Sequence, residues 1–163
     1  MKKAACILAL ICMLFVSGCS YSETYEEVSI TGEEGTISLK IPDGWKSEVY
    51  PEGSAELINV EFGIHVYPES VAKGFIEIGY QNSFGVCGTG LKQEEMQLAG
   101  VTARVGTYDE QDYWTFIVFG EGKIVAYSNL VDTWFNEYED QILEILDTLE
   151  YMLFTENSSD DLE

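Results

Sequence analysis

Apolar and polar residues alternate along several short stretches of this chain, a period of two that is typical of strands with one buried face. The alternation runs through residues 36–41, 58–67, 76–81 and 101–105. Residues 113–119 are instead apolar, aromatic or β-branched throughout, which favours a central strand covered on both faces. The pattern therefore predicts an antiparallel β-sheet built from short strands.

Turn sequences separate these predicted strands. Pro42-Asp43-Gly44 ends the first run, and Pro68 ends the second. Gly63 lies inside the second run and marks a bulge or a bend, so that run is one long strand or two. Residues 109–111 and the glycine-rich residues 120–123 join the last three predicted strands into a meander.

The period changes to that of a helix over residues 136–151. One face of this helix collects the apolar side chains Tyr138, Ile142, Ile145, Leu146 and Leu149. Asn136, with Glu139 three residues later, resembles a capping box. We therefore expect an α/β domain of the α+β kind, in which a single antiparallel β-sheet packs against a C-terminal amphipathic helix.

The N-terminus has a different pattern. Two lysines precede an apolar run over residues 4–15, and Val16-Ser17-Gly18-Cys19 closes it. This ending resembles the lipobox of bacterial lipoproteins, which implies cleavage after Gly18 and a diacylglyceryl thioether on Cys19. The apolar run is shorter than the roughly 17 to 25 residues that a membrane-spanning helix needs. An uncleaved or conventionally cleaved signal is the less favoured alternative.

A second resemblance concerns the folded part. The opening Thr-Ile-Ser-Leu-Lys-Ile-Pro-Asp-Gly-Trp and the closing Ile-Leu-Glu-Ile-Leu-Asp-Thr-Leu resemble the PsbP-like fold of small exported proteins and lipoproteins. The resemblance spans residues 28–152. It implies an α/β sandwich that serves as a binding or assembly module, and it brings no catalytic residues with it.

These observations divide the chain into four segments. Residues 1–18 are the predicted lipoprotein signal peptide, and residues 19–27 hold the lipidated cysteine and a short polar tether. Residues 28–152 are the predicted domain, since 145 residues remain after cleavage and this is the length of one domain. Residues 153–163 are polar and acidic without periodicity, so we expect a disordered tail.

Charge restricts the partners of this chain. Without the two signal lysines, six basic residues face 29 acidic ones, a net charge of −23. Nucleic acid is excluded as a partner because phosphate binding needs a basic face. The same charge repels anionic lipids, so we expect the lipid on Cys19, rather than the protein surface, to hold the protein at the membrane. A cation or another envelope protein remains as a partner.

Cys87 is the one cysteine of the predicted domain. It lies in Phe84-Gly85-Val86-Cys87-Gly88-Thr89-Gly90-Leu91, where three glycines allow a tight loop. A reactive thiol at this place would need His65 or Lys92 nearby to lower its pKa. The favoured interpretation is a small buried hydrophobic residue in a tight connection.

His65 is the only histidine of the chain. The alternation places it on the face of Glu61 and Tyr67, opposite Ile64 and Val66. A Cys87-His65-Glu61 arrangement is conceivable, so Cys87 and His65 are the candidates for catalysis. The favoured interpretation of His65 is a partly exposed strand residue without a catalytic role.

The acidic turn Asp109-Glu110-Gln111-Asp112 is the best candidate for calcium. It lacks the spacing and the distal glutamate of an EF-hand loop, which favours solvated charge. We expect no metal site and no cofactor.

These features favour a bacterial lipoprotein anchored at the extracytoplasmic side of the cell membrane, with a non-enzymatic binding or accessory role. One alternative is a thiol-dependent enzyme or redox protein that uses the Cys87 loop. A second alternative is a calcium-responsive adhesion or sensor domain.

Overall fold

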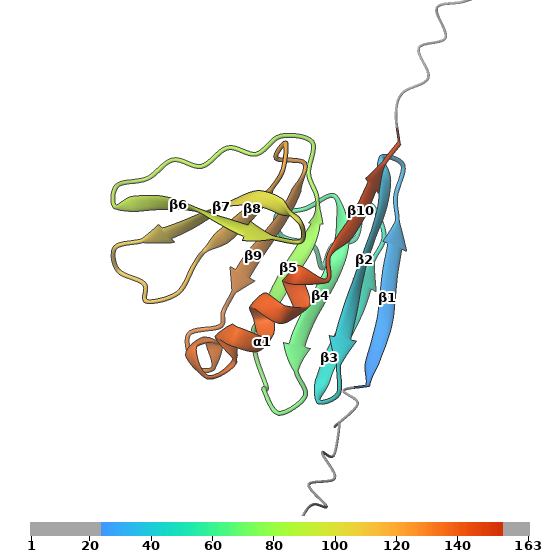
Figure 1. The fold of residues 1–163 in the computed structure, drawn as a ribbon, viewed down its shortest axis with the longest axis horizontal. Helices are drawn as coiled ribbons and strands as arrows, with labels where there is room; N and C mark the ends of the chain where they lie inside the picture. Colours follow the sequence, from blue (N-terminus) through green and yellow to red (C-terminus); the bar gives the residue numbers. More distant parts are fainter. Residues whose placement is uncertain (1–23, 155–163) are drawn as a thin grey trace, which may run out of the picture.

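The computed structural model describes residues 24–154, which form two antiparallel β-sheets and one helix (Figure 1). The smaller sheet has the order β1-β2-β10 and consists of β1 (Tyr25–Thr31), β2 (Gly35–Pro42) and β10 (Glu150–Leu153). The larger sheet has the order β3-β4-β5-β9-β8-β7-β6 and consists of β3 (Trp45–Tyr50), β4 (Phe62–Pro68), β5 (Phe75–Tyr80), β6 (Leu91–Leu98), β7 (Val101–Tyr108), β8 (Phe116–Phe119) and β9 (Ile124–Asn129). The helix α1 (Phe135–Asp147) precedes β10. These residues are an α+β fold made mainly of strands.

The expectation of a single sheet was wrong. Strand β2 pairs with β1 on one side and with β10 on the other, so neither of its edges is available to β3. The chain turns at Asp43 and Gly44, where Gly44 has a φ of 86° that favours glycine, and β3 then pairs with β4. The Pro-Asp-Gly turn therefore passes the chain from one sheet to the other.

The main core lies between the two sheets and the helix. It collects every second side chain of the strands, together with the apolar stripe of α1, and its members include Ile37 and Leu39 of β2, Ile64 and Val66 of β4, Ile76 and Ile78 of β5, and Ile142, Ile145 and Leu146 of α1. The alternation read from the sequence is thus confirmed for β2, β4 and β5. The opposite face of the larger sheet, which we call the outer face, carries the intervening residues, among them His65, Glu77 and Phe116.

The helix begins and ends earlier than expected. Its N-cap residue is Trp134, which makes no capping hydrogen bond through its side chain. Asn136 lies inside the first turn. Its side-chain amide donates a hydrogen bond to the Asp112 carboxylate at 2.9 Å instead of capping the helix. Helix α1 ends at Asp147 because Glu150 starts a strand that pairs with β2.

The polar edges of the sheets account for the strands that the pattern did not predict. Strand β6 is an edge strand whose residues are mostly exposed, so it shows no alternation. Strand β1 begins at Tyr25, which makes residues 25–27 part of the smaller sheet rather than of a tether. The predicted central strand is confirmed in its second half, since β8 lies between β7 and β9 and all four of its residues are buried.

Several predictions concern residues outside the described range. The signal peptide, the cleavage after Gly18, the lipid on Cys19 and most of the acidic tail belong to these residues. The tail was predicted to start at residue 153, but Leu153 belongs to β10 and the Phe154 amide donates a hydrogen bond to the Glu34 carbonyl at 2.8 Å. Within residues 24–154, the helix is too short and too polar to cross a membrane.

Candidate functional site

A cleft of about 460 Å³ opens on the outer face of the larger sheet, at the end formed by β3, β4 and β5. The loop between β3 and β4 and the turn between β4 and β5 complete its walls. The lining consists of Glu48, Tyr50, Glu56, Ile58, His65, Tyr67, Val71, Ala72, Lys73, Gly74 and Phe75. Aromatic rings and carboxylates thus share one concave surface.

Strand register brings the polar residues of this region together. Glu48 of β3 lies opposite His65 of β4, and His65 lies opposite Glu77 of β5. Tyr127 of β9 lies opposite Glu77 and continues the row. Because directly opposite residues point to the same face, these four side chains follow one another across the outer face.

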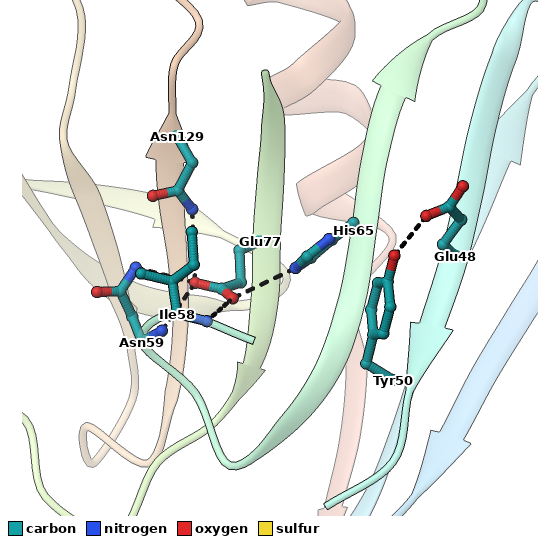
Figure 2. A network of polar contacts seen from close by, with 7 residues as sticks. All are labelled: Glu48, Tyr50, Ile58, Asn59, His65, Glu77 and Asn129. Atoms are coloured by element: carbon teal, nitrogen blue, oxygen red, sulfur yellow. Dashed lines mark hydrogen bonds and ion pairs between the residues drawn. The ribbon is translucent and has the colours of Figure 1, made fainter. Parts of the chain in front are cut away.

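Glu77 is fully buried and accepts hydrogen bonds from several directions (Figure 2). Its donors are the Ile58 backbone amide at 2.8 Å, the Asn59 backbone amide at 3.1 Å, the Asn59 side chain at 2.9 Å and the Asn129 side chain at 3.4 Å. Burial acts to raise the pKa of Glu77, but the hydrogen bonds from His65, Ile58 and Asn59 outweigh it and hold the pKa below its usual value. Glu77 is therefore a buried carboxylate that fastens the β3–β4 loop to the sheet.

His65 lies between two aromatic rings and beside Glu77. Its Nε2 atom is 3.3 Å from Oε1 of Glu77. The Phe75 ring stacks on it with centroids 3.8 Å apart, and the Tyr50 ring packs against it at 4.4 Å. His65 is only 4% exposed, so the expectation of a partly exposed residue was wrong. Its neighbours on β3 and β5 cover it, and one strand alone cannot reveal them.

Glu48 stands at the other side of the cleft and is held by two phenols. Tyr67 donates a hydrogen bond to Oε1 at 2.7 Å, and Tyr50 donates one to Oε2. These hydrogen bonds lower the pKa of Glu48. In turn, the hydrogen bond to Glu48 raises the pKa of Tyr50 to about 12 and raises that of Tyr67 as well. Both phenols stay protonated and Glu48 stays ionised at neutral pH.

Cys87 is exposed, so its interpretation as a small buried hydrophobic residue was wrong. Phe84 and Val86 are half-buried against Phe116, Val118 and Val125, while Gly85 and Cys87 alternate outward. The sheet therefore takes up Phe84 and Val86, which precede the cysteine, and leaves the thiol in solvent.

The structure does not bring Cys87 and His65 together. The Cys87 carbonyl accepts a hydrogen bond from Tyr108 of β7 at 3.4 Å, and β7 is four strand positions from β4, or about 19 Å. His65 is occupied by Glu77, and Lys92 pairs with Asp109 at 2.6 Å. Glu61, the third member considered, accepts a hydrogen bond from the Asn82 amide at 2.8 Å.

The acidic turn after β7 does not converge on one point. Asp109 pairs with Lys92, and the Asp112 carboxylate accepts the hydrogen bond from Asn136. A second cleft of about 470 Å³ lies there, lined by Thr89, Gly90, Tyr108, Asp109, Glu110 and Gln111. Within residues 24–154, no three or more His, Cys, Asp or Glu side chains are grouped so that they could hold a metal ion.

Sequence reasoning missed Glu77, Glu48, Tyr50 and Phe75 as site residues. A signal existed for Glu77, which is the one charged residue in the otherwise apolar run of β5. An isolated carboxylate in a buried strand needs partners, and it therefore points to a polar network. No comparable signal existed for Glu48, because β3 reads as a mixed polar strand.

Comparison of the chain with protein-family models, with curated proteins and with solved structures finds no match.

Proposed function

We propose that this chain is a lipid-anchored, non-enzymatic binding protein at the extracytoplasmic side of a bacterial cell membrane, and that it binds its ligand in the cleft between β3, β4 and β5. The anchor rests on the lipobox resemblance at Cys19. The binding site rests on the cleft and on the way its floor is built.

The buried Glu77 is the observation that carries the proposal. The eleven-residue connection between β3 and β4 contains no helix or strand that would hold it as a wall of the cleft. Glu77 accepts the backbone amides of Ile58 and Asn59 and so fixes the end of that loop to β5. A pre-formed concave site with few, oriented polar groups is typical of a ligand-binding pocket.

The polar groups of the cleft form hydrogen bonds with one another and are not arranged as a catalytic set. Nε2 of His65 faces Glu77, and both phenols of the cleft donate their protons to Glu48. The exposed thiol of Cys87 lies at another part of the sheet. This arrangement supports recognition of a ligand by shape and charge.

The PsbP-like resemblance of residues 28–152 is part of this proposal. Its support is the buried Trp45 after the Pro-Asp-Gly turn and the amphipathic helix α1 near the end of the domain. An experimental structure tests it through the order and connection of the strands. A different strand connectivity from that of PsbP-like proteins would contradict it.

A cleft-filling variant tests the binding site. Ala72 is exposed and lines the cleft, so Ala72→Trp fills the site without entering the core. The matched control is Gln93→Trp at an exposed position of β6. The full-length chain in detergent micelles is titrated by calorimetry with small cationic, anionic and neutral organic molecules. Saturable binding that Ala72→Trp removes and Gln93→Trp retains is expected, whereas a lack of binding across the whole set would contradict the cleft as a site.

Metabolic labelling tests the anchor. A bacterial host that expresses the full-length chain is fed an alkyne-tagged fatty acid, and the label and the membrane fraction are measured. The wild type is expected to carry the label and to sediment with membranes, and Cys19→Ala is expected to lose the label. An unlabelled wild-type chain would remove the anchor from the proposal.

A further inference from the structure

We propose that the cleft binds the positively charged side chain of a lysine or arginine that a partner protein presents. This inference rests on the proposed function, in which the cleft is the ligand site. It is carried by the carboxylates, the hydrogen-bonding state of the phenols, the aromatic walls and the apolar stretch of the lining.

Neither carboxylate of the cleft, Glu48 or Glu56, forms an ion pair in the described part of the chain, although Lys46 and His65 act on the charge of Glu48 without pairing with it. Ion pairs within residues 24–154 join His65 to Glu77 and Lys92 to Asp109, and neither involves Glu48 or Glu56. Two phenols hold Glu48 in its ionised form. The net charge of −21 for the whole chain adds a field that draws cations to this surface.

The phenols of the cleft can accept a hydrogen bond but have none left to give. Tyr50 and Tyr67 each spend their single O–H on Glu48, which leaves the lone pairs of the phenol oxygens. A ligand for this part of the cleft must therefore bring donors. Ammonium and guanidinium groups carry several donors and no acceptor, whereas a carboxylate or a phosphate carries acceptors only.

Aromatic faces favour the same ligand. Tyr50, Tyr67 and Phe75 line the cleft, and the π-face of such rings attracts a cation. The stack of Phe75 and Tyr50 around the His65 ring shows that these rings are already held in place. Rings that need no rearrangement lose less free energy on binding.

The apolar part of the lining favours an organic cation over a metal ion as the ligand. Ile58 is 63% exposed and lines the cleft, and Val71 and Ala72 belong to the same lining. The methylene stem of lysine or arginine covers apolar surface of this kind while its charged end stays near carboxylates. A cleft of about 460 Å³ has room for such a side chain, and it is far larger than a bare ion requires.

Lys73 also lines the cleft, and its removal is expected to change the affinity for a cation in the direction opposite to the removal of a carboxylate. Its side chain is exposed, and no carboxylate of residues 24–154 pairs with it. A positive charge at this place competes with a bound cation for Glu48 and Glu56. Removal of that charge should tighten binding, and removal of a cleft carboxylate should weaken it.

The experiment measures the affinity of blocked amino acids for the full-length chain in detergent micelles by calorimetry. The probes are the N-acetyl methylamides of lysine, arginine, norleucine and glutamate, together with free butylammonium. We expect saturable binding of the lysine and arginine probes, with norleucine and glutamate at least tenfold weaker. Glu56→Gln should weaken the lysine probe about threefold, the usual size of one partly exposed charge pair. Lys73→Gln should tighten it, and Glu94→Gln, a matched change on β6, should leave it unchanged.

Each contrary result has a separate meaning. Binding of norleucine or glutamate that Ala72→Trp removes would overturn the inference and leave the cleft as a binding site. Binding of butylammonium without the blocked lysine would also overturn it, because the cleft would then exclude a side chain attached to a backbone. Equal weakening by Glu56→Gln and Glu94→Gln would show general charge attraction and overturn the site. No binding of any probe would contradict the proposed function as well.

Discussion

The two halves of the outer face belong to the same β-sheet but are covered differently. At the end formed by β7, β8 and β9, the chain covers its own sheet, since Phe84 and Val86 pack on Phe116, Val118 and Val125. At the end formed by β3, β4 and β5, the β3–β4 loop covers only the part of the sheet around Glu77, and an aromatic and acidic cleft remains open beside it. Burial by the chain itself completes one half, and a network of polar contacts shapes the other.

This difference shows that two kinds of interaction, apolar burial and a hydrogen-bonded polar network, order the two halves of one sheet face. In the covered half, stability comes from the area removed from water. In the open half, it comes from a buried carboxylate whose hydrogen-bond donors are in place. We therefore expect substitutions in the two halves to act on stability through these separate causes.

Replacement of Glu77 by leucine is expected to have the largest effect on stability. It removes the acceptor of the part-buried Ile58 and Asn59 amides and the partner of the buried His65, which costs about 3 kcal/mol of unfolding free energy. Denaturant unfolding of the full-length chain measures the loss. Glu95→Leu, on the exposed part of β6, is the matched control. Equal midpoints for the two variants would contradict the role given to Glu77.

Truncation of Phe84 tests the covered half. Its ring packs 5.0 Å from that of Phe116, and the Arg104 guanidinium lies 5.9 Å from its centre. Phe84→Ala is expected to cost about 1.5 kcal/mol, because a half-buried aromatic side chain is lost. Ile58→Ala in the open cleft should cost almost nothing, since Ile58 is exposed. A larger loss for Ile58→Ala than for Phe84→Ala would reverse the comparison.

Acid should weaken the open half through Glu77. Its pKa in the folded protein lies below the usual 4.5, so the stabilisation is present above that value and is lost as the pH falls through the folded pKa. We expect the difference in stability between the wild type and Glu77→Gln to shrink from pH 7 to pH 3. Unfolding curves at several pH values measure it. A difference that grows on acidification would require a raised pKa.

Accessibility of Cys87 is the smallest effect and concerns the outward-facing side of the covering segment. The exposed thiol should react with iodoacetamide in the folded chain at nearly the rate seen in denaturant. Mass spectrometry of the Cys87 peptide follows this residue apart from the other cysteines of the chain. Labelling only after denaturation would show that Cys87 is buried against the sheet, as Phe84 and Val86 are.

Sequence patterns predicted those elements whose partners are close in the chain. The hairpin of β8 and β9 follows from a dense apolar run and a glycine-rich turn, and both are local. The side of β4 that carries His65 follows from its alternation with Ile64 and Val66. Strand β6 could not be predicted in the same way, because an exposed edge strand has no buried face to mark its period.

The candidate site depends on neighbours that the sequence does not place. His65 is buried by Tyr50 and Phe75, which come from two other strands whose register is a property of the whole sheet. Cys87 is exposed because Phe84 and Val86, which alternate with Gly85 and Cys87, pack inward. Reasoning residue by residue therefore located the right strand for His65 and the wrong environment.

The central claim is that the open half of the outer face is the part that meets a ligand. Backbone amide chemical shifts of the isotope-labelled full-length chain in micelles, recorded during titration with N-acetyl-lysine methylamide, test it most directly. The account predicts saturable shifts at Tyr50, Ile58, Tyr67 and Phe75, with Phe84 and Val86 unchanged. Shifts confined to the segment around Phe84, or no saturable shifts at all, would contradict it.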